Sequence, residues 1–476
     1  INTLNKKLKP SLKNNGGYFD IVIGNPPYIK EYTNKAAFND FKESKYYQGK
    51  MDLWYGFACE MMDKLKSNGI QSFIAQNNWI TSAGASKLRE KILSDTQIKS
   101  FVDFGNYKVF ESAGIQTMIY LIQKKEINPE ITYSIKYSLL KNENLPEEKL
   151  KEFLVFDFKT DYAQKFLFDI TPSSIKEKAF TFNTNDNEVL LNQIASVANY
   201  RFSNNEVAQG IVFPQDFLNK ANQKILGDNF KVNEGMFALT KEELNQLHLT
   251  QKEKELIKPY YTTENFKRYY ANPENKFWLI YTVSSFKDPK NIDPYPHIKQ
   301  HLDRFKNLIT SDNKPYGLHR ARDERFFLDE KIIVQRKCAG KPVFTYTNFN
   351  TYVSATFYII KPFQGNYKYL TALLNSTLIE FWLKNKGKMQ GNNFQIDKEP
   401  LVNIPLIIPK KVIQFEILVD YIIYLNDKNS NQLSPHTTNN IIASQIEDVL
   451  NMMVYELYFE THMKEVGIDI LQFINP

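Results

Sequence analysis

Four residues near the start of the sequence, Asn25-Pro26-Pro27-Tyr28, have types and an order that suit the chemistry of a poorly nucleophilic amine. The amide oxygen of Asn25 and the carbonyl oxygen of Pro26 can accept hydrogen bonds from both N–H groups of such an amine, which draws its nitrogen toward tetrahedral geometry. The two prolines restrict the backbone, so the acceptors need little reorganisation during reaction. Tyr28 offers an aromatic face to the ring that carries the amine, a contact worth roughly 1–3 kcal/mol. The tetrapeptide therefore predicts a loop that activates an amine on a planar base.

The residues before this loop indicate where it lies in a fold. Phe19 to Gly24 is a short apolar run with β-branched residues, as expected of a buried parallel strand. Pro26 and Pro27 lack the N–H donors that a strand ladder needs, so the strand ends there. The loop is thus predicted at the carboxyl end of a strand, where open α/β sheets bind ligands. A plain strand-ending turn is the alternative, and the position directly after a buried strand disfavours it.

Helical and strand-like patterns alternate through residues 1–125. Apolar residues recur at helical spacing from Leu53 to Leu65, and Asn68-Gly69 is predicted to stop that helix. Further strands are expected at 70–75, 98–104 and 116–122, with a helix at 83–93. This alternation predicts an α/β fold, the C-terminal half of a doubly wound sheet.

The remainder of the chain has a different character. Residues 126–190 are charged without a clear period and are predicted to form a bridging segment. From 191 to 476, short β-like runs are interrupted by Asn, Gly and Pro, and two apolar-periodic helices follow near 411–426 and 438–459. This pattern predicts a mixed α+β domain with C-terminal helices.

Composition limits the class of protein. The 476 residues are 42% hydrophobic and 24% charged, which is enough to fill two or three domain cores. No apolar run approaches the ~20 residues of a membrane span, so no membrane association is expected. Only Cys59 and Cys338 occur, which disfavours a disulfide framework or a thiolate zinc site and favours the reducing cytoplasm. No His or Cys cluster has metal-ligand spacing, and no metal is predicted.

The run from Phe19 to Tyr28 looks like motif IV of the class I amino-methyltransferases that act on adenine in DNA. Later stretches resemble the following motifs in order: Gly49 to Phe57, Gly69 to Trp79, Leu88 to Phe104, and Val109-Phe110. The resemblance implies a methyltransferase sheet, S-adenosylmethionine as cofactor, and catalysis by Asn25 to Tyr28. It also implies that a flipped adenine packs between Tyr28 and Phe110.

The same family binds its cofactor with a glycine-rich loop and an acidic residue that precede motif IV. Only Ile1 to Tyr18 precede it in this sequence, and Gly16-Gly17 is not such a loop. We therefore expect a missing N-terminal segment or a separate subunit to carry these contacts. The chain by itself is expected to bind the cofactor poorly and to be inactive.

Parts of the second half resemble the specificity domain of the TaqI-like and Eco57I-like branch, as found in type IIG restriction–modification enzymes. These parts are Ile257 to Tyr260, Phe266 to Tyr269, Tyr295 to Ile298, and Leu373 to Ser376. The resemblance implies a target-recognition domain for double-stranded DNA, and a net charge of +7 is compatible with that partner. The candidate DNA contacts are Lys267, Arg268, Arg320, Arg322, Arg336 and Lys337. A solvated surface is the alternative for each basic cluster.

Two other functions remain open at this point. The chain could be a DNA-specificity module without catalysis, in which the partial methyltransferase domain serves as a docking platform. The same tetrapeptide also occurs in enzymes that methylate a glutamine side chain of release factors, but those are compact, and the large second half argues against them. No nuclease site is convincing in the sequence, so cleavage by the parent enzyme stays undecided.

Overall fold

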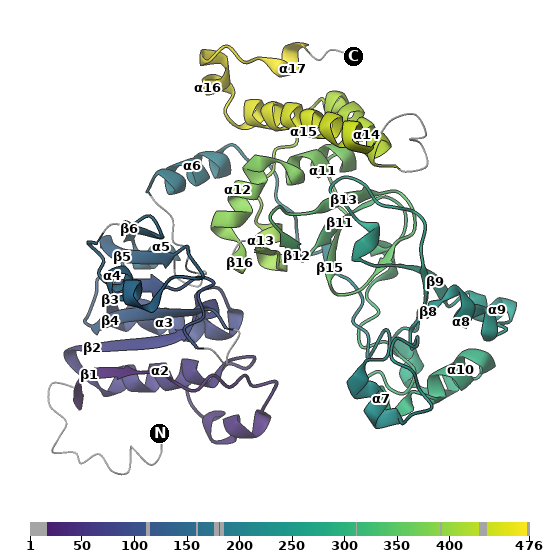
Figure 1. The fold of residues 1–476 in the computed structure, drawn as a ribbon, viewed down its shortest axis with the longest axis horizontal. Coiled ribbons are helices and arrows are strands. Elements are labelled where there is room, and N and C mark those ends of the chain that lie inside the picture. The colour runs from purple at the N-terminus through teal and green to yellow at the C-terminus, as the bar shows by residue number, and fades with distance from the viewer. Residues whose placement is uncertain are drawn as a thin grey trace. The chain divides into compact units, whose positions relative to one another are not determined.

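The computed structural model divides the chain into two compact units, Ile1–Asn192 and Gln193–Pro476 (Figure 1). The structure describes residues 17–110, 115–158, 160–175, 180, 185–310, 312–390, 393–427 and 436–473.

Unit 1 is built on a six-stranded sheet of order β1-β2-β4-β3-β5-β6. β1 and β2 are parallel, as are β3 and β5, whereas β4 is antiparallel to both β2 and β3. Because β1, β2, β3 and β5 run in one direction, their carboxyl ends lie at one edge of the sheet. The strands are β1 (Phe19–Gly24), β2 (Leu65–Gln76), β3 (Thr96–Asp103), β4 (Thr117–Lys124), β5 (Tyr133–Leu140) and β6 (Ala163–Ile170). β5 and β6 come from the segment expected to bridge, and they extend the sheet.

Helices cover both faces of this sheet, which confirms the predicted α/β class. Phe73, Phe101 and Tyr120 pack with residues of α2 and α3, while alternate strand residues pack with α4 on the other face. The helices are α2 (Leu53–Lys64), α3 (Ser86–Asp95), α4 (Glu147–Leu154), α5 (Pro172–Ile175) and α6 (Asn185–Ser196), and the 3-10 turns are η2 (Lys35–Phe41), η3 (Asn77–Ile80) and η4 (Ala83–Ala85).

The predicted end of α2 is wrong. The helix stops at Lys64 because Leu65 is already extended, with φ −70° and ψ 142°, and pairs with Phe19 of β1. Asn68 and Gly69 therefore lie within β2. Asn68 takes a left-handed φ of 65° at a point where the pairing of β1 and β2 is irregular.

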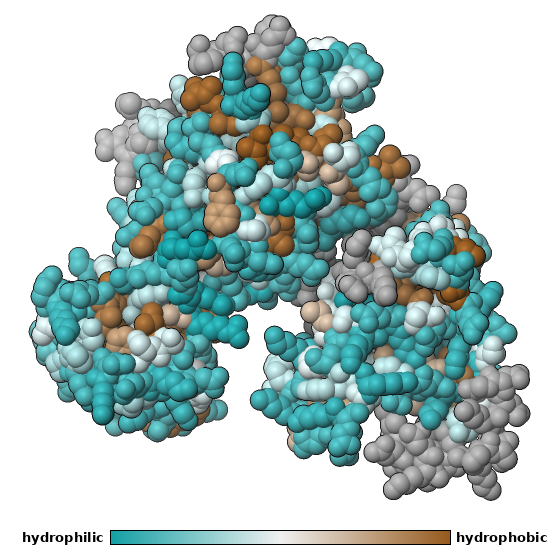
Figure 2. All heavy atoms as spheres, turned by 180° about the vertical axis from the view of Figure 1, so that it is seen from behind, coloured by the Kyte–Doolittle hydropathy of each residue, from teal (hydrophilic) through white to brown (hydrophobic). Residues whose placement is uncertain are grey.

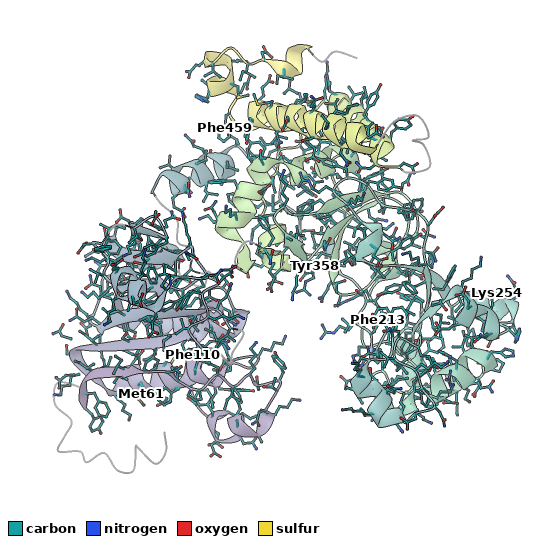
Figure 3. All side chains as sticks on the ribbon, in the orientation of Figure 1. Met61, Phe110, Phe213, Lys254, Tyr358 and Phe459 are labelled. Carbon is teal, nitrogen blue, oxygen red and sulfur yellow. The ribbon has the colours of Figure 1, made fainter. Side chains whose placement is uncertain are left out.

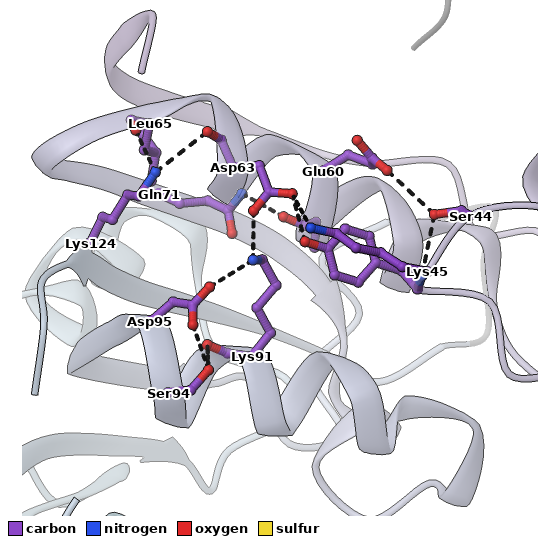
Figure 4. A network of polar contacts seen from close by, with 12 residues as sticks. Ser44, Lys45, Glu60, Asp63, Leu65, Gln71, Lys91, Ser94, Asp95 and Lys124 are labelled. Atoms are coloured by element: carbon purple, nitrogen blue, oxygen red, sulfur yellow. Dashed lines mark hydrogen bonds and ion pairs between the residues drawn. The ribbon is translucent and has the colours of Figure 1, made fainter. Parts of the chain in front are cut away.

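A polar network holds α3 against α2 (Figure 4). Lys91 Nζ lies 2.6 Å from Asp63 Oδ1 and 2.7 Å from Asp95 Oδ2, and the Tyr46 hydroxyl donates to Asp63 Oδ2 at 2.6 Å. Burial alone would lower the pKa of Lys91, but its hydrogen bonds to Asp63 and Asp95 raise it, so the amine stays charged. The network therefore holds α2 and α3 in fixed positions relative to each other on one face of the sheet.

Unit 2 contains three small sheets and a set of helices at its C-terminal end, as predicted. Their strand orders are β14-β9-β10-β8, β13-β11-β15-β7 and β12-β17-β16. The strands are β7 (Val207–Gln209), β8 (Ala238–Thr240), β9 (Ile257–Tyr261), β10 (Phe277–Ile280), β11 (Lys331–Gln335), β12 (Lys337–Ala339), β13 (Phe344–Thr347), β14 (Tyr352–Val353), β15 (Phe357–Ile360), β16 (Lys388–Gln390) and β17 (Asn393–Gln395).

The helices of unit 2 are short until the C-terminal pair α14 and α15. They are α7 (Lys220–Leu226), α8 (Lys241–Gln246), α9 (Gln251–Lys254), α10 (Pro296–Asp303), α11 (Tyr367–Asn375), α12 (Thr377–Lys386), α13 (Lys398–Val402), α14 (Ile413–Asn426), α15 (His436–Tyr458), α16 (Glu460–Glu465) and α17 (Ile470–Phe473). The 3-10 turns are η5 (Thr263–Asn265), η6 (Ser284–Lys287), η7 (Pro289–Ile292), η8 (Lys306–Leu308) and η9 (Glu324–Phe326).

The face seen in Figure 2 is mainly hydrophilic, with hydrophobic residues gathered near the C-terminal helices. Ile413, Ile417 and Tyr421 of α14 are exposed at helical spacing. Among the described residues, no helix has both the length and the apolar character needed to span a bilayer.

Candidate functional site

Asn25 is exposed directly after β1, and the hydroxyl of Tyr28 holds its side chain. The Tyr28 oxygen lies 2.6 Å from Asn25 Oδ1 and 2.8 Å from the carbonyl oxygen of Ile74 on β2. Burial, followed by the nearby charge of Asp52, raises the pKa of Tyr28 to about 12. The phenol therefore stays protonated near neutral pH, and its one hydrogen is shared between two acceptors. This contact leaves Asn25 Oδ1 with acceptor capacity for an incoming donor.

Asp52 anchors the backbone that follows the loop. It is the N-cap of α2, and its Oδ1 accepts hydrogen bonds from the amides of Ile29 at 2.9 Å and Trp54 at 3.5 Å. Asp52 is buried, and its Oδ2 has no hydrogen-bond partner among the described residues. Burial raises the pKa of this carboxyl. Sequence reasoning gave Asp52 no role, although an Asp before an apolar helical run is an N-cap signal.

Two further side chains order the same edge of the sheet. Arg89 Nη1 donates to the carbonyl oxygens of Trp79 at 2.7 Å and Ser82 at 2.6 Å, which fixes the segment after β2. The buried Asp103, at the end of β3, accepts from the Gly105 amide at 2.9 Å. The connections after β2 and β3 are therefore held by the polar side chains of Arg89 and Asp103 inside the fold.

Phe110 lies in the connection between β3 and β4 and is half-buried (Figure 3). Because β1 and β3 are parallel, this connection leaves the sheet at the same edge as the Asn25 loop. Three strand spacings separate β1 from β3, which corresponds to about 14 Å. The structure thus brings Tyr28 and Phe110 to one edge, and a base held between them remains a prediction.

A hollow of about 410 Å³ runs beside β1 toward Asn25. Among the described residues β1 pairs with β2 alone, so its other edge has no strand beside it. The side chains of Ile21 and Ile23, which point to one face of the sheet, are 66% and 79% exposed. Phe57 and Met61 of α2 form the opposite wall (Figure 3). Unpaired apolar strand edges are templates for further pairing.

S-adenosylmethionine carries an ammonium, a carboxylate and ribose hydroxyls that require polar partners. The hollow is lined by apolar residues, glycine and proline, with Asn25 as its one polar side chain. The described residues by themselves therefore do not fit this cofactor. They contribute the exposed loop at Asn25 and one wall of the space next to it.

Arg320 and Arg322 line a second hollow of about 410 Å³, which lies wholly within unit 2. Arg336 borders it, because its guanidinium lies 5.2 Å from the ring centre of Tyr358, another lining residue (Figure 3). Arg336 is also 2.9 Å from Asp397 Oδ1. Three of the six predicted DNA-contacting residues thus gather in one place.

Two family models match the sequence in the predicted order. Residues 1–110 match the Eco57I restriction-modification methylase family, and residues 258–406 match the TaqI-like C-terminal specificity domain. The chain belongs to the Eco57I/TaqI-like adenine-specific DNA methyltransferases.

Relatives of this methyltransferase cover both units. The type II methyltransferase M.HincII of Haemophilus influenzae is 23% identical over 410 residues, which span 81% of this chain and 73% of that protein. The type II methyltransferase M.HindII of Haemophilus influenzae (strain ATCC 51907 / DSM 11121 / KW20 / Rd) is 20% identical over 415 residues, 81% of this chain and 74% of that protein.

The solved structure of the type IIL restriction-modification enzyme MmeI in complex with DNA has the same fold. It aligns with a TM-score of 0.56 and 14% identity, over 94% of this chain. This chain spans 57% of the MmeI chain.

In this methyltransferase chain, the other predicted DNA-contacting residues are not among those that line the second hollow, which we call the basic hollow. Arg268 is engaged inside unit 2: its guanidinium donates to the carbonyl oxygens of Pro342 and Asn375 and lies 3.0 Å from Glu447. These internal partners occupy most of the Arg268 guanidinium, and its role as a DNA contact stays a prediction. Lys267 and Lys337 are exposed, the latter on β12, and stay predictions.

Sequence reasoning missed Gln209 and Lys398 of the second hollow. They lie 189 positions apart in the sequence and meet only through the fold, so no local pattern pointed to them. Among the described residues, no group of three or more His, Cys, Asp or Glu side chains is placed to hold a metal ion.

Proposed function

We propose that this chain carries the amino-methylating and target-recognition parts of a site-specific DNA adenine-N6 methyltransferase from a restriction–modification system. The observation that carries the proposal is Asn25, whose amide oxygen is held by the Tyr28 hydroxyl at the carboxyl end of β1. Its position in a chain of this family supports adenine in DNA as the substrate.

The chemistry assigned to the chain is the orientation of the adenine amine. Asn25 Oδ1 accepts one N–H of the amine, and the Pro26 carbonyl oxygen accepts the other. The nitrogen lone pair is then withdrawn from the ring and directed at a methyl donor. Tyr28 and Phe110 hold the extruded base by stacking, and the Tyr28 hydroxyl keeps the Asn25 amide in place.

S-adenosylmethionine is the methyl donor that the family implies. We propose that its contacts are carried by a segment that adds a parallel strand to the outer edge of β1, either from the same polypeptide or from a separate subunit. The edge of β1 that is unpaired among the described residues supports the added strand. The exposed Ile21 and Ile23 and the apolar wall of α2 support cover over the same strand by that segment. Because the cofactor contacts lie on that added segment, the residues that the structure describes would not methylate DNA by themselves.

Transfer of labelled methyl groups from S-adenosylmethionine to duplex DNA by the full-length gene product tests the proposal. Asn25→Ala removes one acceptor, and kcat is expected to fall about 100- to 1,000-fold, as when one preorganised polar partner is lost from other active sites. Asn144→Ala, the same change at an exposed position of unit 1, is expected to retain activity. Undiminished transfer by Asn25→Ala would refute the assigned role.

The two alternatives give different results in the same assays. Glutamine methylation predicts no affinity for duplex DNA, and the match of residues 258–406 to a specificity domain disfavours it. A specificity module without catalysis predicts salt-dependent duplex binding by the full-length gene product without methyl transfer.

A further inference from the structure

The second hollow lies in unit 2 beside β7, the last strand of its sheet. Segments that are distant in sequence line it. The backbones of Val212 and Arg320 exchange hydrogen bonds of 3.0 and 3.1 Å, which bring the arginine-rich segment beside the continuation of β7. α13 begins at Lys398, whose Nζ donates to the Asn204 carbonyl oxygen at 2.9 Å. The charged lining consists of Arg320, Arg322, Arg325 and Lys398, together with Asp323, and Asn204, Asn205 and Gln209 add amide groups.

This hollow gathers positive charge without enough negative charge to balance it. Four of its lining residues are cationic, and the one carboxylate among them, Asp323, lies 2.9 Å from Arg325 Nε. Burial and the proximity of Arg322 lower the pKa of Lys398, and burial and Arg320 lower that of Arg322. The cations therefore repel one another, and a bound anion would relieve the repulsion.

The arginines are arranged so that donors remain available. Arg322 is fixed from behind, with Nε donating to the Gly210 carbonyl oxygen at 3.2 Å and Nη2 to Gln209 Oε1 at 2.9 Å. Nη1 is not used in these contacts. The backbone of Arg322 has a φ of +73°, an unfavourable conformation for a residue with a β-carbon, and such strain collects at functional sites. Arg320 is exposed, and its side chain has no hydrogen-bond partner among the described residues.

We propose that this hollow binds a backbone phosphate of duplex DNA, an inference that rests on the proposed function. Phosphates are the outermost groups of a duplex and can enter a recess in a protein surface. Base edges lie at the floor of a groove and are read by side chains that protrude. Arg322 and Lys398 line the hollow and are half-buried, so they do not protrude as base-reading side chains do. This burial favours a phosphate over a base edge as the group they contact.

Binding of a fluorescently labelled duplex to the full-length protein, measured across a salt series, tests this site. Arg320→Gln leaves the backbone pairing with Val212 intact and removes one phosphate partner. Its affinity at low salt is expected to fall about 10-fold, and the slope of log K against log salt to flatten by about 1. The exposed Lys306→Gln makes the same charge change outside the hollow and is expected to leave both quantities close to wild type.

Two additions separate a phosphate contact from a base contact. Arg320→Lys is expected to stay within about threefold of wild type, because a phosphate accepts a point charge, whereas bidentate base reading needs the guanidinium fork. The loss caused by Arg320→Gln is expected to be equal on two duplexes of unrelated sequence. A loss confined to one duplex would assign Arg320 to base reading and overturn the proposal.

The remaining outcomes are also decisive. If wild type binds the duplex and both Arg320→Gln and Lys398→Gln match Lys306→Gln, the phosphate site is refuted while DNA binding stands. If wild type does not bind duplex DNA at all, both this site and the DNA part of the proposed function are refuted. Thermal unfolding of each variant confirms that it is folded.

Discussion

The hollow beside the Asn25 loop of unit 1 and the basic hollow of unit 2 have similar volumes. They differ in how completely the described residues form their walls. The hollow beside Asn25 is apolar and borders a strand edge that is unpaired within the described part of the chain. The hollow beside Arg320 is polar and is lined by residues of its own unit. Under the proposed function, methyl transfer depends on a further strand at β1, whereas DNA binding depends on unit 2 alone.

The largest expected effect comes from charging the edge of β1. Ile23 is 79% exposed, so Ile23→Lys would cost little if β1 and the sheet face that carries this side chain faced water. If the added segment covers β1 on that face as well, methyl transfer by the full-length protein is expected to fall at least about 100-fold, because a lysine charge would be buried. The affinity for duplex DNA is expected to stay unchanged.

Ile131→Lys, at a position of unit 1 that is 56% exposed, is the matched control for this change. Equal methyl transfer by the two variants would show that the edge of β1 is not covered.

The next effect concerns the stability of unit 2. Glu253 is buried and joins α9 to α10, because its carboxylate accepts from the amides of Thr250 at 2.8 Å and His297 at 2.7 Å. Burial alone would raise the pKa of Glu253, but these and further hydrogen bonds bring it down to about 2. Glu253→Gln is expected to lower the free energy of unfolding of unit 2 by about 2 kcal/mol at pH 7.

The pH dependence of the same group has a definite sign. The pKa of Glu253 is lower in the folded protein than its ordinary 4.5, so its stabilisation is present above pH 4.5 and is lost as pH falls toward 2. Denaturant unfolding at pH 7 and pH 3.5 measures this. Wild type should lose more stability than Glu253→Gln, and equal losses would contradict the role of the carboxylate.

A smaller effect is expected at Tyr28. Tyr28→Phe keeps the aromatic face but removes the hydroxyl that contacts Asn25 Oδ1 and Ile74. Loss of this positioning contact is expected to lower kcat about 10-fold, equivalent to about 1.4 kcal/mol, with little change in KM for DNA. An unchanged kcat would show that Asn25 needs no such support.

The smallest effect is expected at Asp52. Asp52→Asn keeps an oxygen that accepts from the Ile29 amide and removes a charge whose burial raises the pKa of the carboxyl. Wild-type stability should therefore decline as pH rises from about 3.8 to the raised pKa of the folded protein, and the variant should not share that decline. At pH 7 the difference in the free energy of unfolding is expected to stay within about 1 kcal/mol. A larger loss in Asp52→Asn would show that the negative charge itself is required.

The sequence predicted features that local patterns determine. Phe19 to Tyr28 was predicted as a buried strand followed by a loop, since β-branched residues and consecutive prolines act over a few positions. The strand and the loop are present, but the predicted burial is wrong for the described residues, because Ile21 and Ile23 are exposed. The stop of α2 was mispredicted because the pairing of Leu65 with Phe19, a contact over 46 positions, overrides the turn signal of Asn68-Gly69. The partners of Arg268 and the members of the basic hollow likewise depend on long-range packing that no local pattern encodes.

The most direct test of the account measures kcat for methyl transfer and Kd for duplex DNA side by side in Asn25→Ala and Arg320→Gln of the full-length protein. The account predicts that Asn25→Ala loses transfer about 100-fold or more at unchanged Kd. It predicts that Arg320→Gln weakens Kd about 10-fold and retains kcat at saturating DNA. Transfer that survives in Asn25→Ala, or a loss of both quantities together in either variant, would contradict it.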